Sequence, residues 1–233
     1  MKLEKETSSE SRPPPRYADA CGTAHALDLV GDRWAMLIMR ELMLGPKRFG
    51  EIRAALPGIS ANMLSRRLAE LERDLLLCRR RLDPPNAVQL YALTPWGLEL
   101  EPLLCGLGRW AARSPGHDPT LPISASSLVL SLRTMFDPDK GAWLTLCFEL
   151  AMEAEWFAGR VAGRRFEIIR GRAPDAELRV AGSPARLAAA IYGGAPLEDL
   201  RATGELSIQG DAQMARRLFE CFVLPSKAGR PLG

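Results

Sequence analysis

The sequence predicts an α+β chain of two domains, the first mostly helical and the second a sheet flanked by helices. With 233 residues the chain is longer than one average domain. Three prolines and a glycine fall within residues 113–122 and interrupt regular structure there. Apolar residues recur at helical spacing before this break, and at alternate positions in several segments after it.

We expect a disordered tail at 1–16, a first domain at 17–113, a linker at 114–122, a second domain at 123–225 and a tail at 226–233. The N-terminal tail is polar and proline-rich, so it cannot bury a core of its own. It lacks the apolar core of a signal peptide, and no apolar run approaches the roughly 20 residues of a membrane span. We therefore expect a cytoplasmic protein without a membrane partner.

Composition argues against several kinds of site. The five cysteines are scattered and odd in number, which indicates reduced thiols rather than a disulfide framework or a metal knuckle. Two histidines are too few for a histidine-rich metal site, and they make a Ser/His/Asp triad improbable. The prediction is a non-enzymatic protein with no metal and no cofactor.

The first domain begins with two helices within Ala18–Leu44, divided at Gly31-Asp32. A short helix carrying Phe49, Ile52 and Leu56 follows and ends at Pro57-Gly58. Ser60 is a good N-cap for the next helix, whose buried stripe we expect to be Leu64, Leu68, Leu71 and Leu75.

Two strand-like runs, Leu77–Leu82 and Val88–Leu93, surround a turn at 83–86 and predict a hairpin. Thr94 and Pro95 then open a last helix, which we expect to run through Leu98, Leu103, Leu107 and Trp110. The order is helix, helix, turn, helix, hairpin, helix, which is that of a winged helix-turn-helix. Trp34, Phe49 and Trp110 are expected in the core or in a dimer interface rather than at a ligand.

The second domain alternates helices and strands. We expect helices at Ser124–Phe136, from Pro184 to Gly193, and after an Asp211 cap. Strands are expected at Trp143–Leu150, Glu155–Ala162, Arg165–Arg170, Glu177–Ala181 and Glu205–Gln209. The fold predicted is a helix-flanked antiparallel or mixed sheet.

The helix that Ser60 caps has a polar face suited to a DNA groove, because Asn pairs with adenine, Arg with guanine and Ser with several base edges. A cluster of arginines follows on the hairpin and would contact phosphates without selecting sequence. Solvated helix positions are the alternative interpretation. The predicted DNA-binding residues are Ser60, Asn62, Ser65, Arg66, Arg73, Arg79, Arg80 and Arg81.

Six motifs in this order resemble the HxlR-type winged-helix regulators over residues 17–113. They are Cys21, Gly31-Asp32-Arg33-Trp34, Arg48-Phe49, Pro57-Gly58-Ile59-Ser60, Leu64-Ser65-Arg66-Arg67-Leu68 and Tyr91-Ala92-Leu93-Thr94-Pro95-Trp96-Gly97. The resemblance implies a bacterial homodimer that binds an inverted-repeat operator in double-stranded DNA. Where the family commonly has a glycine after the recognition helix, this chain has Asp74-Leu75, and we expect burial of Leu75 to offset the strained cap.

The second domain more distantly resembles sterol-carrier-protein-type domains. The similarity is carried by Pro174–Val180, by the helix that Pro184 opens and by Gly204-Glu205-Leu206-Ser207-Ile208-Gln209-Gly210-Asp211. This resemblance implies an apolar pocket for a hydrophobic small molecule. The expected lining is Leu144, Leu146, Phe148, Leu150, Phe166, Ile168, Leu206, Ile208, Met214 and Leu218.

The function expected is regulation of transcription, with operator affinity modulated by that ligand. One alternative is redox sensing through Cys21, because some regulators of the resembling type sense oxidants through a cysteine at that position. A lipid carrier with a vestigial DNA-binding domain is another, and an enzyme using the second pocket is a third, disfavoured by the lack of a catalytic constellation.

Overall fold

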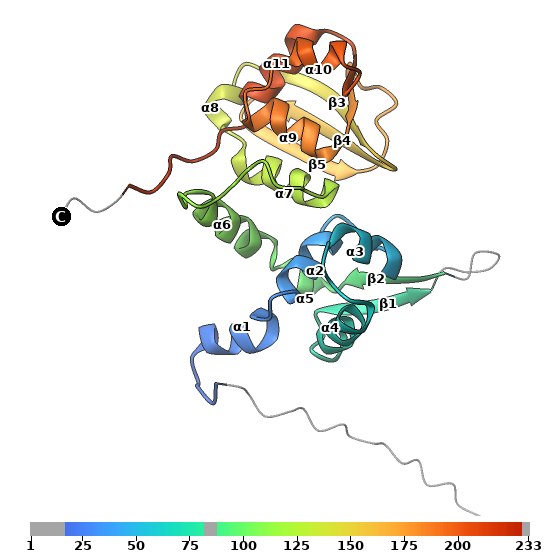
Figure 1. Cartoon of the computed structure of the whole chain (residues 1–233), viewed down its shortest axis with the longest axis vertical. Coiled ribbons are helices and arrows are strands. Elements are labelled where there is room, and N and C mark those ends of the chain that lie inside the picture. Colours follow the sequence, from blue (N-terminus) through green and yellow to red (C-terminus); the bar gives the residue numbers. More distant parts are fainter. Residues whose placement is uncertain (1–16, 82–87, 230–233) are drawn as a thin grey trace, which may run out of the picture.

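The computed structural model describes residues 17–81 and 88–229 and has a mixed α and β architecture. The expected tail at 1–16, the hairpin turn at 83–86 and the last residues, 230–233, lie outside this part of the chain. Figure 1 shows a helical half, residues 17–113, next to a sheet half, residues 123–225. Within the described ranges, no helix has the length and apolar character needed to cross a membrane.

The helical half has the element order that the sequence predicted, with one difference. Its elements are α1 Gly22–Val30, α2 Ala35–Leu42, α3 Phe49–Ala55, α4 Ala61–Arg73, β1 Leu77–Arg81, β2 Gln89–Leu93, α5 Pro95–Leu98 and α6 Glu101–Ala112. We expected one continuous helix after Thr94, but it is divided into α5 and α6. Pro102 accounts for the division, because a proline inside a helix removes one N–H donor and clashes with the carbonyl four residues earlier.

Polar caps fix where the helices of this half begin. The Ser60 hydroxyl accepts the Met63 backbone N–H at 3.2 Å, and the Thr94 hydroxyl accepts that of Gly97 at 3.0 Å. Each bond satisfies a donor that has no partner inside the helix. The two caps predicted from the sequence are confirmed.

Leu75 is exposed, and the expectation that it belongs to the buried stripe of α4 is wrong. Its φ is +61° and its relative exposure is 69%. The Leu76 N–H bonds to the Leu71 carbonyl at 2.9 Å, and the Leu75 N–H bonds to that of Glu72 at 3.1 Å. This pair of bonds is a Schellman motif, with Leu75 in the left-handed position that glycine prefers and Leu76 buried instead.

The sheet half contains a five-stranded mixed sheet in the order β5-β4-β3-β6-β7, with β3 and β6 parallel and the other neighbours antiparallel. In Figure 1, α9 and α11 lie in front of this sheet and α7 lies beneath it. The short helices α8 and α10 were not expected. The elements are α7 Ala125–Met135, α8 Pro138–Gly141, β3 Thr145–Met152, β4 Glu155–Ala162, β5 Arg165–Arg170, β6 Leu178–Gly182, α9 Pro184–Tyr192, α10 Leu197–Ala202, β7 Leu206–Gln209 and α11 Ala212–Glu220.

The residues expected to line an apolar pocket pack together in the core of the sheet half. Leu144, Leu146, Phe148, Leu150, Ile168, Leu206 and Leu218 are buried, and Phe166, Ile208 and Met214 are partly buried against them. Aromatic rings pack against one another in this core: the Phe136 and Phe166 rings stack at 5.2 Å, and the Phe222 ring meets Phe166 edge-on at 5.1 Å. Opposite Phe148 the chain has Gly159, where a Cβ would lie 2.1 Å from the Phe148 ring.

The two halves meet through a buried polar network as well as through apolar contacts of α7 with α2 and α6. Lys47 Nζ lies 3.1 Å from Glu41 Oε2 and 2.9 Å from the Ser126 hydroxyl, and the side chains of Glu41 and Lys47 are 0% and 4% exposed. The Ser124 hydroxyl donates to Glu41 Oε1 at 2.6 Å. Charges this deeply buried require partners, so the network holds the halves in one arrangement.

The end of the sheet half returns to the chain segment where that half began. The Ala228 N–H bonds to the Arg113 carbonyl at 2.7 Å. Lys227 Nζ donates to the carbonyls of Ala112, Ser114 and His117. Residues 226–229 therefore lie against the segment that we expected to be a linker.

Candidate nucleic-acid interface

Helices α3 and α4 are joined by a tight turn that sets the direction of α4. Pro57 and Gly58 form this turn, and Gly58 has a φ of +90°, which glycine adopts without steric cost. Ile59 is buried beneath the turn. The arrangement leaves one face of α4 free of the rest of the molecule.

The free face of α4 is the one the sequence predicted. Leu64, Leu68 and Leu71 are buried on its other side. The exposed positions are Asn62, Ser65, Arg66, Ala69 and Arg73, with Ser60 at the N-cap. The face therefore presents amide, hydroxyl and guanidinium groups beside a small residue, which is suitable chemistry for base edges in a major groove.

Arg66 is exposed but held in place. Its side chain is 63% exposed, and its Nε lies 3.0 Å from Glu70 Oε1 one turn along the helix. An i,i+4 ion pair at the surface contributes only a few tenths of a kcal/mol, so DNA can replace it at small cost.

Arg67, which lies in the basic cluster of the sequence, is buried and has a structural role. Its guanidinium pairs with Asp32 at 2.5 Å and with Glu70. Asp32 also accepts the Trp34 backbone N–H at 3.0 Å. Arg67 thus anchors α4 to the turn between α1 and α2. Its position in the sequence, beside Leu64, Leu68 and Leu71 on the helical wheel, is the signal that distinguishes it from Arg66.

The hairpin places its arginines next to the C-terminal end of α4. Arg79 Nε lies 2.9 Å from Glu72 Oε2, which ties β1 to α4, and Arg73 pairs with Asp74 at 3.3 Å. Arg80 and Arg81 are exposed, and the described residues provide no ion pair for either. Successive residues of a strand point to opposite faces, so Arg79 and Arg81 share one face and Arg80 lies on the other.

Cys21 is exposed at the start of α1, far along the chain from the α4 face. The backbone N–H groups of Ala24 and Thr23, together with the Thr23 hydroxyl, lower the pKa of the Cys21 thiol. A helix N-terminus favours a thiolate in this way.

Comparison with known proteins assigns this half of the chain to a family. The model of the HxlR-like helix-turn-helix family matches residues 29–118. The HTH-type transcriptional regulator YvaP of Bacillus subtilis is 41% identical over 87 residues, covering 37% of this chain and 80% of YvaP. The chain belongs to the HxlR-like helix-turn-helix family. It is a transcriptional regulator of the HxlR type, which confirms that part of the prediction.

Other regulators show a similar extent of similarity to this chain. The regulator YodB of Bacillus subtilis is 41% identical over 86 residues, covering 37% of this chain and 77% of YodB. Its reduced form has a solved structure with a TM-score of 0.39 and 36% identity, covering 43% of this chain and all of that one. A structure of the redox regulator HypR in its reduced form has a TM-score of 0.37 and 31% identity, covering 39% of this chain and 90% of that one. These matches cover about two fifths of the HxlR-type chain.

Proposed function

We propose that this HxlR-type chain binds an inverted-repeat operator as a homodimer and that a ligand of the sheet half changes its affinity for DNA. The observation that carries DNA binding is the free face of α4, with Asn62, Ser65 and Arg66 exposed opposite a fully buried leucine stripe. On this proposal α4 enters the major groove and those three side chains contact base edges.

The hairpin would supply affinity that does not depend on sequence. Arg80 and Arg81 carry positive charge that no described carboxylate neutralises, which suits contacts to phosphate oxygens. Arg79 and Arg73 are paired with Glu72 and Asp74 and would contribute less unless those pairs open. Binding should therefore weaken steeply as salt rises.

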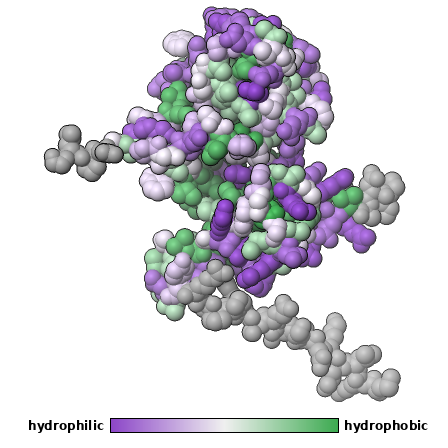
Figure 2. Space-filling view, in the orientation of Figure 1, coloured by the Kyte–Doolittle hydropathy of each residue, from purple (hydrophilic) through white to green (hydrophobic). Residues whose placement is uncertain are grey.

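Two helices supply an apolar surface that fits a dimer interface. On α6, Leu103, Leu107 and Trp110 are 64%, 47% and 72% exposed at helical spacing, and Leu27 of α1 is 46% exposed. Figure 2 shows apolar surface over α1 and α6 on one side of the molecule. A second copy would cover these residues, and a dimer would present two α4 helices to half-sites about one helical turn apart.

Control by the sheet half is supported by where that half rests. It packs on α6, which belongs to the proposed dimer interface, and on α2. A surface hollow of about 600 Å³ between α9, α10 and α11 is lined by apolar residues, among them Ile191, Leu197 and Phe219, and by the charged residues Lys140, Glu198, Arg216 and Glu220. A hydrophobic small molecule would suit such a hollow. A ligand that preferred one arrangement of the halves would change operator affinity by its own preference ratio.

The test is selection of bound sequences from random DNA with full-length protein, followed by titration of the selected operator. An inverted repeat bound by two chains supports the proposal, and random DNA bound equally well contradicts it. Native mass spectrometry of the purified protein identifies any co-purified molecule, which is then added back to the operator titration. A molecule that binds without changing operator affinity would refute ligand control and leave DNA binding standing.

A second candidate function is redox sensing through Cys21, favoured by its exposure and by the lowered pKa of its thiol. An exposed thiol with thiolate character reacts with oxidants and electrophiles. Diamide or a quinone should then weaken operator binding of the wild type and leave Cys21→Ser unaffected. Equal responses of the two proteins would exclude this function.

A further inference from the structure

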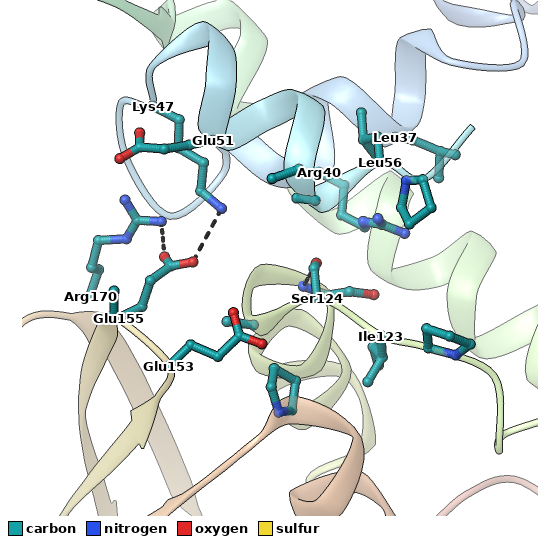
Figure 3. Close-up of a pocket in the computed structure, with 18 of the residues that line it drawn as sticks. Leu37, Arg40, Lys47, Glu51, Leu56, Ile123, Ser124, Glu153, Glu155 and Arg170 are labelled. Atoms are coloured by element: carbon teal, nitrogen blue, oxygen red, sulfur yellow. Dashed lines mark hydrogen bonds and ion pairs between the residues drawn. The ribbon is translucent and has the colours of Figure 1, made fainter. Parts of the chain in front are cut away.

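A cavity of about 680 Å³ lies between the two halves and is built by both of them. Helices α2 and α3 form one wall. The start of α7, the turn between β3 and β4, and Arg170–Arg172 form the other (Figure 3). None of the ten residues expected to line a pocket of the sheet half takes part in it. Its volume is in the range of sites for small organic ligands.

The lining combines aromatic and aliphatic surface. Trp34 just before α2, Leu37 of α2 and Leu56 at the end of α3 face the cavity from the helical half. Ile123 and Trp156 do so from the sheet half. Each tryptophan also holds an arginine over its ring, Arg33 at 5.1 Å from Trp34 and Arg172 at 4.9 Å from Trp156. These rings therefore act as platforms for cations in the molecule as it stands.

The cations in the cavity wall each have a carboxylate partner. Arg40 pairs with Glu41 at 3.0 Å, and Lys47 shares Glu41 at 3.1 Å and Glu155 at 3.5 Å. Arg170 pairs with Glu155, as Figure 3 shows. Arg172 pairs with Glu149 at 3.1 Å. Positive charge in the wall is therefore largely neutralised by the protein itself.

Glu153 is different, because no ion pair within the described residues involves it. It is exposed and lines the cavity from the turn between β3 and β4. In Figure 3 its carboxylate points into the space between the halves. Glu51, the other acidic side chain of the wall without an ion pair there, accepts the Arg48 backbone N–H at 2.6 Å as part of the α3 cap.

The backbone at Glu153 is also strained. Met152 and Glu155 are directly paired, so Glu153 and Ala154 form a two-residue hairpin loop, and Glu153 has a φ of +55°. A loop with positive φ at its first position is the kind in which glycine predominates. Glutamate at this position costs backbone energy, and strain of this sort is concentrated at ligand sites. The turn thus loses stability by having at this position a carboxylate that forms no ion pair within the described structure.

We infer that the cavity between the halves binds a lipophilic organic cation, with Glu153 as its counter-ion and the tryptophans and aliphatic side chains around its body. The ligand class is a quaternary ammonium, phosphonium or protonated amine that carries aromatic or branched apolar groups. A carboxylate without an ion-pair partner, beside aromatic and aliphatic surface in a wall whose cations are already paired, attracts such an ion, because the ion's charge and its apolar groups both find partners.

A ligand in this cavity would affect DNA binding, and this part of the inference rests on the proposed function. The ligand would touch α2 and α3 on one side and the β3–β4 turn on the other, beside the Lys47–Glu155 pair that joins the halves. A cation bound to both walls would favour the arrangement in which the two walls face one another. Operator affinity should then change by the preference of the ligand for that arrangement.

The test uses tetraphenylphosphonium and tetraphenylborate, two ions of the same shape and opposite charge, each titrated into full-length protein by calorimetry. We expect one phosphonium per chain, bound at least tenfold more tightly than the borate. Glu153→Gln should weaken phosphonium binding at least tenfold. Glu167→Gln, which removes another exposed carboxylate that does not line the cavity, should leave phosphonium binding unchanged. The inference is overturned if borate binds as tightly as phosphonium, or if Glu153→Gln binds phosphonium as tightly as the wild type does.

Two further variants separate charge from strain and site from regulation. Glu153→Gly should raise the melting temperature, because glycine relieves the strain of the turn. The same variant should lose phosphonium binding. If it keeps tight binding, Glu153 is not the counter-ion. Titration of the selected operator with and without phosphonium tests the coupling. If phosphonium binds in the cavity without an effect on operator affinity, only the coupling is overturned. If the protein binds no operator, the proposed function is overturned, and calorimetry still shows whether the cavity binds the cation.

Discussion

Lys47 of the helical half lies 3.5 Å from Glu155 of the sheet half, measured between Nζ and Oε1. The backbone of the same lysine pairs with Tyr91 in β2, with N–H···O distances of 3.0 and 2.9 Å. One residue therefore touches the hairpin with its backbone and the sheet half with its side chain. Lys47 thus links the sheet half to the hairpin that we propose contacts phosphates.

Lys47→Met should destabilise the protein by about 3 kcal/mol. The substitution keeps most of the volume but leaves Glu41, which is 0% exposed, with fewer partners for its charge. Urea unfolding measures the change. Lys140→Met, which replaces an exposed lysine, should lie within about 0.5 kcal/mol of the wild type. Equal stability of the two variants would show that the network is dispensable.

Leu75→Gly should stabilise the protein by about 1 kcal/mol. Glycine adopts the positive φ of the Schellman position without steric cost, and a side chain that is 69% exposed has little burial to lose. Thermal unfolding should show a higher Tm. Leu75→Ala is the control, because alanine removes the same apolar group and keeps the strain. If alanine and glycine raise the Tm equally, strain at Leu75 is not the cause.

Arg66→Ala should weaken operator binding by about 1 to 3 kcal/mol and relax the preference at one base pair. Arg80→Ala should weaken operator and random DNA alike, because a phosphate contact carries no sequence information. Fluorescence anisotropy on the operator, on its single-base variants and on random DNA makes the comparison. If Arg66→Ala binds all of these as the wild type does, α4 does not present the face proposed here.

Substitution of both Leu107 and Trp110 by Glu should give a monomer. Charge placed on the exposed apolar face of α6 cannot be buried against a second copy. Light scattering at micromolar concentration reports the mass. Leu121→Glu changes another exposed leucine outside α6, and this variant should have the same mass in solution as the wild type. A dimeric double variant would place the interface elsewhere.

Stability should fall as pH rises above 10, in part through Tyr192. Burial raises the pKa of this phenol to about 12 from an ordinary value of 10, although its hydrogen bond with Ser131, 2.9 Å long, acts in the other direction. The unfolded state loses its proton first, so the stability contributed by the neutral phenol is complete below pH 10 and is lost between 10 and 12. At pH 11 the loss is about 1.4 kcal/mol.

Tyr192→Phe isolates this contribution, because other groups such as Cys221, with a raised pKa of about 11, titrate in the same direction. Urea unfolding at pH 8 and pH 11 gives the fall in stability for each protein. The fall should be about 1.4 kcal/mol smaller for the variant. Equal falls would mean that Tyr192 is not protected from solvent.

Sequence patterns predicted most of this fold because its local signals are strong. Ser60, Thr94 and Asp211 cap the helices they were expected to cap, and the strands follow the alternation of buried residues. The helix break before Pro102 and the exposure of Leu75 were predicted wrongly. Each depends on one residue within a longer apolar pattern, and that pattern alone indicates a continuous helix and a buried leucine. Helices α8 and α10 were missed because four and six residues are too few to show a period.

The sequence predicted which residues of the DNA-binding face are exposed. It did not predict the ion pairs that hold this face from the interior side. Arg66 and Arg67 are adjacent in the sequence, yet one is exposed and the other is buried on Asp32. The cavity between the halves had no signal at all, because Trp34, Ile123, Glu153 and Trp156 come together only through tertiary packing. A sequence pattern describes one element at a time and cannot show which elements share a wall.

The hydrogen bond between Ala228 and Arg113 has a consequence for how such a chain could arise. It brings the exit of the sheet half next to its entry, so this half begins and ends at one place on the surface of the molecule. A unit with adjoining ends can be fused behind α6 of a stand-alone winged helix without threading through it. The same geometry should permit circular permutation of the sheet half, with new ends opened at the strained Glu153 hairpin or at another exposed turn.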